Sequence, residues 1–159
     1  MKRLTLATAT VAALLALAAP ATAENFNGTS WTDAIAGTPR ADTIRGFGMD
    51  DFLRGHGGND EIYGNRGNDT LLGDRGNDFL RGGVGADTIY GGLGNDTIFD
   101  GPGRDRSYGG PGDDQFLPDP DGKVDVFYCG DGHDTVAYWG EPETIDRWVN
   151  CEQVINWAH

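Results

Sequence analysis

Aspartate recurs at a fixed spacing over most of this 159-residue sequence, and that spacing is the first indication of chemistry. Ten consecutive nine-residue units run from Gly28 to Leu117, and the sixth residue of all ten is Asp. Gly opens nine of the ten units, and an apolar residue occupies position eight in nine of them. Carboxylates and the carbonyls of glycine-rich turns are hard oxygen ligands, which are typical of calcium sites. Neither His nor Cys recurs in the same register, which disfavours zinc and copper.

The position-six aspartates divide into two sets, because two units of nine residues complete one coil and units of the same parity then stack. The first set is Asp42, Asp60, Asp78, Asp96 and Asp114, and the second is Asp51, Asp69, Asp87 and Asp105. Asp33, Asp125 and Asp134 extend these sets into units that depart from the pattern. Carboxylates stacked roughly 5 Å apart repel each other by about 1 to 3 kcal/mol per neighbouring pair. We therefore expect several Ca²⁺ ions between the stacked turns.

Turn capping without a metal is the alternative role for these aspartates. An Asp side chain can accept hydrogen bonds from the backbone amides of its own turn. Capping alone does not explain why like charges should be stacked, so metal binding is the preferred hypothesis for the central units. For Asp33, Asp125 and Asp134 the two roles are evenly balanced.

Each unit predicts a turn followed by a short strand. The first six residues are mostly Gly, Asn and Asp, which favour turns, and positions seven to nine place one apolar side chain among β-favouring residues. The pattern predicts an all-β fold, a parallel β-roll with one inward apolar residue per unit. These inward residues are Ile35, Ile44, Leu53, Ile62, Leu71, Leu80, Ile89, Ile98 and Phe116. In the ninth unit Asp100 replaces the opening Gly, and Ser107 leaves a gap in the core.

The first 23 residues have the features of a secretory signal peptide. Lys2 and Arg3 form a positive start, an apolar stretch follows, and Ala21-Thr22-Ala23 fits a small-x-small cleavage site. Removing residues 1–23 changes the formal charge from −13 to −15, because two basic and no acidic residues are lost. We expect a secreted, extracellular, monomeric protein without a membrane span, and its acidity disfavours nucleic acid as a partner.

The remaining chain is expected to form a β-roll over residues 24–137 and a cap over residues 138–159. The strong repeats cover 28–117, and weaker units at 120–137 follow the spacer Pro118-Asp119. The last segment is rich in aromatic residues and shows no clear nonapeptide. Segments of this kind cover the open end of repeat stacks.

Two units carry the clearest motif of the sequence. Residues 82–90, GGVGADTIY, and 91–99, GGLGNDTIF, match the pattern G-G-x-G-x-D-x-U-x, in which U is apolar. The chain thereby resembles the haemolysin-type (RTX, repeats-in-toxin) calcium-binding nonapeptide repeats. The resemblance implies a right-handed β-solenoid in which Ca²⁺ lies between turns two repeats apart and takes Asp side chains and backbone carbonyls from both. The carbonyls would lie near Gly55, Gly58, Gly64, Gly67, Gly73, Gly76, Gly82, Gly85, Gly91 and Gly94. In the first three units Trp31, Arg40 and Met49 replace the position-four Gly, which disfavours calcium sites there.

The sequence contains two cysteines, Cys129 and Cys151. An even number of cysteines in a secreted chain favours a disulfide, which here would join the weaker repeats to the C-terminal cap. Two free thiols are the alternative.

Catalysis finds no support in the sequence, because the three histidines lie at unrelated positions and no catalytic motif is present. We therefore expect a calcium-binding β-roll that is not an enzyme and that folds when Ca²⁺ binds outside the cell. The alternative is an extracellular interaction or adhesion module, in which calcium is structural and an outer sheet face binds a surface or a glycan. Its candidate residues are Phe52, Leu72, Phe79, Tyr90, Phe99, Tyr108 and Leu117. Stacking between neighbouring strands is the other explanation for this apolar stripe.

Overall fold

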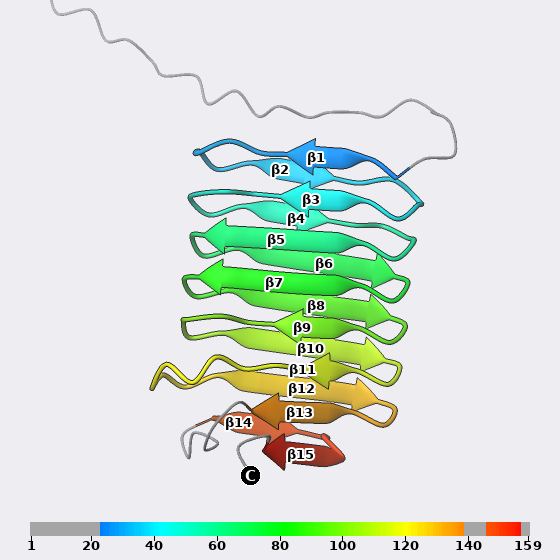
Figure 1. The fold of residues 1–159 in the computed structure, drawn as a ribbon, viewed down its shortest axis with the longest axis vertical. Coiled ribbons are helices and arrows are strands. Elements are labelled where there is room, and N and C mark those ends of the chain that lie inside the picture. Colours follow the sequence, from blue (N-terminus) through cyan, green and yellow to red (C-terminus); the bar gives the residue numbers. More distant parts are fainter. Residues whose placement is uncertain (1–22, 139–145, 157–159) are drawn as a thin grey trace, which may run out of the picture.

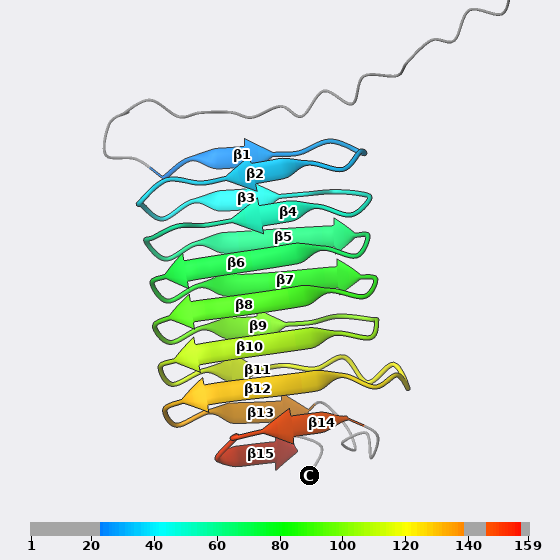
Figure 2. The same ribbon diagram turned by 180° about the vertical axis from the view of Figure 1, so that it is seen from behind.

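The computed structural model describes residues 23–138 and 146–156, which contain β-strands and turns but no helix. The strands form two parallel sheets that lie face to face, and the chain alternates between them as it winds from one end of the molecule to the other (Figures 1 and 2). Nearly all of the expected signal peptide lies outside the described residues. In the described part of the chain, no helix is long and apolar enough to cross a membrane.

Odd-numbered strands form one sheet and even-numbered strands form the other. The eight-stranded sheet contains, in spatial order, β1 (Asn25–Asn27), β3 (Thr43–Arg45), β5 (Glu61–Arg66), β7 (Phe79–Val84), β9 (Thr97–Phe99), β11 (Gln115–Phe116), β13 (Thr135–Tyr138) and β15 (Gln153–Asn156). The seven-stranded sheet contains β2 (Ala34–Ala36), β4 (Phe52–Arg54), β6 (Thr70–Arg75), β8 (Thr88–Leu93), β10 (Arg106–Pro111), β12 (Val126–Asp131) and β14 (Arg147–Val149). Neighbours in each sheet are therefore one full coil apart in sequence.

The register of the strands follows the nine-residue repeat. Ile62 of β5 pairs with Leu80 of β7, and the position-six residues that precede these two strands are 18 residues apart. Two units therefore make one coil, which confirms the predicted parallel β-roll. In the seven-stranded sheet Ser107 of β10 pairs with Phe127 of β12, so the two-residue spacer lengthens the offset to 20 residues. The extra residues form the long turn between β11 and β12, which projects from the edge of the roll (Figure 1).

Position eight points into the narrow space between the sheets, as predicted. The inward side chains that are at most 1% exposed are Ile44, Leu53, Ile62, Leu71, Leu80, Ile89, Ile98, Phe116, Phe127 and Val136. Ile35, in the first unit, is partly buried against this row. Phe26 of β1 precedes the first recognised unit and is also buried, so the core begins one strand earlier than the sequence pattern indicated. Ser107 is fully buried at the position where the pattern has an aliphatic residue.

The turns stack closely at position four. Gly76 has a φ of +129°, and a Cβ at this residue would meet the carbonyl oxygen of Gly58, one coil earlier. Neither the conformation nor the space accepts a side chain, which explains why the pattern requires Gly here. Met49 has a φ of +66° at the equivalent position of the third unit, so the left-handed conformation is kept there, whereas Trp31 and Arg40 in the first two units do not have a positive φ.

The strands β14 and β15 continue the two sheets within the segment that was expected to cap the roll. Residues 139–145 of that segment and 157–159 lie outside the described residues. Cys129 of β12 and Cys151, between β14 and β15, form a disulfide with a Cα–Cα distance of 5.2 Å. This bond, expected from the sequence, ties the last coil to the coil before it.

Candidate metal centre

The position-six aspartates form two columns, one along each edge of the roll. In each column the backbone N–H of one Asp donates to Oδ1 of the Asp one coil further along, at about 2.8 Å, as in Asp60 to Asp78 and Asp69 to Asp87. A short strand follows each Asp directly, so the residue is held at the point where the turn ends. The repeat therefore brings each carboxylate against the next coil, as the sequence predicted.

The second carboxylate oxygen is buried and has no hydrogen-bond partner in most of these residues. Along the regular repeats, the residues with such an Oδ2 atom are Asp51, Asp60, Asp69, Asp78, Asp87, Asp96, Asp105 and Asp114. All eight side chains are at most 3% exposed. An unpaired carboxylate oxygen away from water costs free energy unless a proton or a cation reaches it.

A backbone carbonyl lies close to each of these unpaired oxygens in the central units. The space that a Cβ on Gly64 would fill is bounded by Oδ2 of Asp69 and by the carbonyl oxygen of Gly82, which is 2.6 Å from the Cβ position. The same arrangement recurs at Gly55, Gly73 and Gly91, each with the Asp of its own unit and the position-one carbonyl one coil further along. Position-one glycine thus leaves a small space shared by a carboxylate and a carbonyl oxygen, a donor set that suits Ca²⁺.

Burial raises the pKa of the stacked carboxyl groups. The pKa of Asp60, Asp87 and Asp96 rises to about 7, and that of Asp78 to about 6, chiefly because burial penalises the charged form. The carboxylates of neighbouring coils raise the pKa of Asp60 and Asp96 further, whereas the hydrogen bond from the backbone N–H lowers the pKa of all four. The free-energy cost of burying these ionised carboxylates is removed only when a proton or a cation binds them.

The first two units differ from the rest, and the difference lies in a threonine at position two. Oδ2 of Asp42 accepts hydrogen bonds from the N–H and the hydroxyl group of Thr38, at 2.6 and 2.9 Å. Asp33 has the same two bonds from Thr29. These carboxylates are engaged within their own turns, so a metal-binding role is least supported at Asp33 and Asp42.

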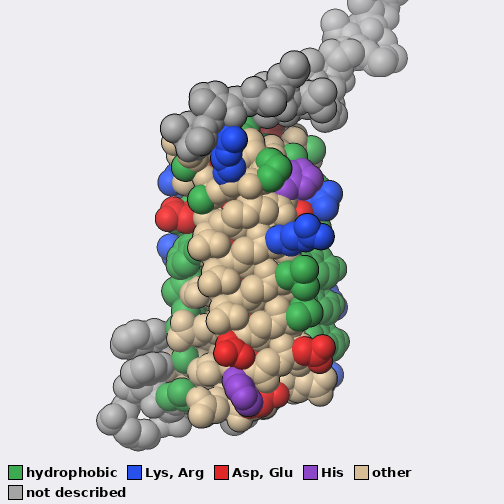
Figure 3. Space-filling model, turned by 90° about the vertical axis from the view of Figure 1, so that its right-hand side faces the viewer, with side chains coloured by type: hydrophobic (Ala, Val, Ile, Leu, Met, Phe, Trp, Pro, Cys, Tyr) green, Lys and Arg blue, Asp and Glu red, His purple; other side chains and the backbone are tan. Residues whose placement is uncertain are grey.

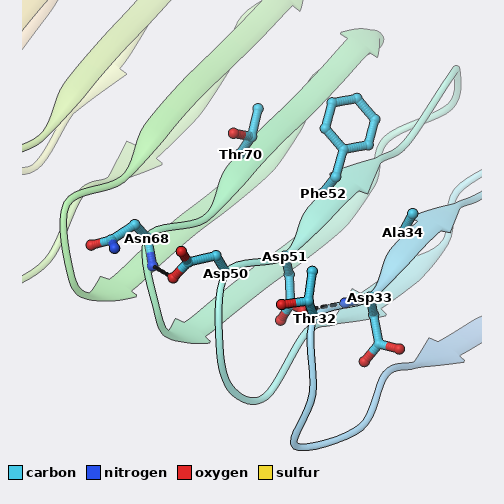
Figure 4. A pocket seen from close by; sticks show the side chains of 8 residues that line it. All are labelled: Thr32, Asp33, Ala34, Asp50, Asp51, Phe52, Asn68 and Thr70. Carbon is cyan, nitrogen blue, oxygen red and sulfur yellow. Dashed lines mark hydrogen bonds between the residues drawn. The ribbon is translucent and has the colours of Figure 1, made fainter. Parts of the chain in front are cut away.

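Figure 4 shows the column at this end of the roll, where the N–H of Asp33 donates to Oδ1 of Asp51 at 2.8 Å. The neighbouring Asp50 accepts a bond from the N–H of Asn68 at 2.8 Å and lies on the surface. The inner column of position-six residues is therefore flanked by an outer row of position-five residues that bond in the opposite direction, because there the N–H of the later coil donates to Oδ1 of the earlier coil.

At the C-terminal end both columns continue beyond the recognised repeats. Asp125 and Asp134 are buried and accept bonds from the N–H groups of Asp105 and Asp114. In turn, Asp125 donates its N–H to Oδ1 of Asp146, and the N–H of Asp134 donates to a carboxylate oxygen of Glu152 at 2.8 Å. The sequence interpretation missed these last two acidic residues. The signal that could have found them is an acidic residue two positions before an apolar one, as in Asp146-Arg-Trp and Glu152-Gln-Val.

The edge that carries the turns after the even-numbered strands is a band of backbone and uncharged polar side chains (Figure 3). Acidic side chains are visible there at only a few places, in agreement with the burial of the position-six carboxylates. The negative charge of the columns is therefore held inside the turns and is not displayed on the surface.

The aromatic residues of the outer faces stack on one another. Tyr90, Tyr108 and Tyr128 form a row with ring centroids 4.8 and 4.7 Å apart and nearly parallel planes. On the other sheet, Phe79 contacts both Tyr63 and Phe99. Contacts between neighbouring strands thus account for much of the apolar stripe that the sequence left open as an interaction surface.

The two parallel sheets define the class of this chain, a parallel β-roll, and its stacked, buried acidic turns fit a hard cation. A family model described as the RTX calcium-binding nonapeptide repeat, four copies, matches it twice in succession, at residues 45–80 and 81–116. This central part of the chain consists of RTX calcium-binding nonapeptide repeats, which confirms the resemblance. A search of curated proteins finds no significant match.

Proposed function

We propose that this chain is a secreted calcium-binding β-roll that folds when Ca²⁺ binds between its stacked turns. The observation that carries the proposal is the double column of buried carboxylates, whose Oδ2 atoms have no hydrogen-bond partner from Asp51 to Asp114. Each carboxylate lies beside a position-one carbonyl of the next coil in the central units. Ca²⁺ accepts six to eight such oxygen ligands in flexible geometry, so the donor set suits it.

The expected ligands are the position-six carboxylates together with the carbonyls of the glycines at positions one and four. The carboxylates with an unpaired oxygen, from Asp51 to Asp114, are the strongest candidates. Asp134 and Asp125 extend the two columns, whereas Asp42 and Asp33 are engaged by threonines. Ca²⁺ bound here would supply the positive charge that allows these acidic groups to be buried in their ionised form.

Folding on calcium binding follows from linkage. A cation that binds the roll but not the unfolded chain stabilises the roll by an amount that grows with its concentration. The signal-peptide features of residues 1–23 support folding outside the cell, where we expect calcium to be plentiful. In this proposal the roll has no catalytic role.

The test is a calcium titration of residues 24–159, followed by circular dichroism and isothermal calorimetry, first in chelator and then with increasing Ca²⁺. We expect a disordered or loosely ordered chain to gain strand signal and thermal stability as Ca²⁺ is added, with several ions bound per chain. A chain that keeps its full strand signal and melting temperature in chelator would contradict the proposal.

The variant Asp78→Asn sharpens this test, since Asn keeps an acceptor for the N–H of Asp60 but removes a buried charge. We expect it to weaken the calcium-bound roll by about 1 to 3 kcal/mol, the cost of losing a charged buried interaction. In chelator the same variant should be no less ordered than the wild type, because one repelling carboxylate is gone. Asp113→Asn is the matched control: Asp113 is exposed, and its bond from the N–H of His133 can be kept by Asn.

A further inference from the structure

Three buried carboxylates converge in the ninth unit, outside the regular arrangement of the repeat. One oxygen each of Asp100, Asp105 and Asp125 lies within 4.8 Å of the others, and each residue is 1% exposed. Asp100 occupies position one, where the other nine units have Gly. Its side chain therefore enters the space that a position-one Gly leaves open elsewhere in the roll.

The regular stacking of turn on turn ends at this place. The pairing of β9 with β11 stops at Ile98 and Phe116, and the long turn that contains the spacer then lies against the ninth unit. Oδ1 of Asp100 accepts bonds from the N–H of Gly101 at 2.7 Å and from the N–H of Asp119, in the long turn, at 3.1 Å. The long turn replaces the regular turn of the next coil here. At this place the side chain of Asp100 adds a carboxylate to those of Asp105 and Asp125.

Asp100 and Asp105 each have a buried carboxylate oxygen that no protein group satisfies. Oδ2 of Asp100 and Oδ2 of Asp105 are buried and have no hydrogen-bond partner. Neither residue takes part in a salt bridge within the described residues, and the nearby Lys123 pairs instead with Asp121 at 3.1 Å. The hydroxyl oxygen of Ser107, in the same unit, is also buried without a partner.

Burial and the neighbouring like charges disfavour the ionised form of the carboxyl groups in this cluster. Burial raises the pKa of Asp100 well above its usual range, and the neighbouring carboxylates of Asp125 and Asp105 raise it further. Burial likewise raises the pKa of Asp105 to about 8. Three ionised carboxylates at this separation are strongly destabilising unless a cation joins them.

We propose that Asp100, Asp105 and Asp125 form a separate site for one divalent cation, which binds more tightly than the sites between the regular turns. Affinity for hard cations rises with the number of charged ligands and with the rigidity of the site, and this cluster supplies three carboxylates from side chains alone. The site shares Asp105 and Asp125 with one of the two columns, so it rests in part on the proposed calcium-binding function. A cation bound there joins the ninth unit to the start of β12, and thereby the regular repeats to the C-terminal coils.

The experiment compares calcium binding by the mature wild-type chain and by the variants Asp100→Gly and Asp100→Asn, using calorimetry with CaCl₂ and then with MgCl₂. Asp100→Gly restores the residue that the repeat has at position one, so the fold is expected to persist. The second variant keeps the size of the side chain and removes the charge. Asp113→Asn is the control for loss of one surface charge.

We expect the wild type to show one tight binding phase ahead of the others, and both Asp100 variants to lose it or weaken it by at least about tenfold. The remaining phases should be unchanged, and the control should keep the tight phase. If Asp100→Gly binds the same number of ions with the same affinities as the wild type, this separate site does not exist, although the proposed function stands. If no protein binds calcium, both proposals fail together.

Discussion

At the scale of single residues, one aspartate performs two tasks with its two oxygens. Oδ1 of Asp78 accepts the N–H of Asp60 and so joins two coils, while Oδ2 is left buried without a partner. Where position two of the unit is a threonine, as Thr38 is in the unit of Asp42, Oδ2 of the aspartate is hydrogen-bonded within the turn. A threonine at position two therefore marks an aspartate whose Oδ2 is hydrogen-bonded within its own turn, in contrast to the aspartates whose Oδ2 is unpaired.

The raised pKa values predict how acid affects the metal-free chain. The pKa of Asp60, Asp87 and Asp96 is about 7 in the folded, metal-free roll, against 3.8 for the unperturbed group. Between these values the folded chain binds more protons than the unfolded chain, so its stability falls as the pH rises from about 4 to about 7. In chelator we expect more strand signal by circular dichroism at about pH 4.5 than at about pH 8.

Calcium affinity should change in the opposite direction, because the metal binds the ionised carboxylates and displaces protons. Calorimetry at several pH values should show affinity rising up to about pH 7 or 8, with proton release detected through the ionisation enthalpy of the buffer. Equal order at both pH values in chelator, together with a pH-independent calcium affinity, would contradict this account of the buried charges.

At the scale of the element, the turn decides whether one coil can lie on the next. The two sheets supply a row of inward apolar side chains, but from the fourth unit to the tenth the turns stack at distances that leave no room for a Cβ at position four. Gly76 illustrates this, with a positive φ and the Gly58 carbonyl in the place of its missing side chain. Position three is permissive, because Ser, Pro, Arg, Val and Leu occupy it in different units.

The variant Gly76→Ala tests this constraint. We expect it to destabilise the calcium-bound roll by at least about 2 kcal/mol, because the new Cβ meets backbone and the φ of +129° is unfavourable for Ala. Chemical denaturation in saturating Ca²⁺ measures the effect. Gly57→Ala is the matched control, since a Cβ there has its nearest neighbour at 3.7 Å and an ordinary backbone conformation. Equal stability of the two variants would refute the stacking argument.

The sequence predicted the periodic part of this architecture well, because a fixed spacing determines which residues share a face. The inward row from Ile44 to Ile98 and the two aspartate columns follow directly from the repeat. The hydrogen bonds to Thr38 and the unpaired Oδ2 atoms could not be predicted, since both carboxylate oxygens are equivalent in a sequence pattern. The irregular C-terminal coil was also missed, because Asp146 follows Asp125 by 21 residues where the repeat has 18.

Asp100 is the clearest case in which pattern and structure give different interpretations. When the ninth unit is considered alone, Asp100 is a defect in the repeat. The role of Asp100 depends on the long turn that contains the spacer, and this turn lies against Asp100 only after the chain has completed another coil. The proximity of Asp100 to Asp125 is therefore a property of three-dimensional packing that no local motif records.

At the scale of the whole molecule, the roll is a one-dimensional stack in which each coil contacts its two neighbours. Within the two position-six columns each N–H donates to a carboxylate of the following coil, as the N–H of Glu24 does to Asp42, whereas the bonds of the position-five residues run the opposite way. Asp146 and Glu152 accept the last bonds of the two columns. Stability in such an assembly is the sum of interfaces between neighbours, so its ends are its weakest parts.

The disulfide between Cys129 and Cys151 secures the C-terminal end, and its removal should act locally. It closes a separation of 22 residues, for which the loss of the constraint costs about 3 kcal/mol. With reductant, or in the variant carrying Cys129→Ala and Cys151→Ala, hydrogen exchange should accelerate in β14 and β15. The central strands β5 to β8 should remain protected in saturating Ca²⁺. Uniform acceleration along the whole roll would show that the coils do not behave as separable layers.

The 18-residue offset between paired strands also sets the step by which such a protein can change its length. Duplicating or deleting two adjacent units returns the chain to the same sheet and the same column, with both termini in their original surroundings. Inserting or deleting a single unit would instead transfer every later strand to the opposite sheet, including the strands β14 and β15 that flank Cys151. Tandem duplication should therefore be tolerated in even numbers of units, which makes the roll a molecule that can grow by whole layers.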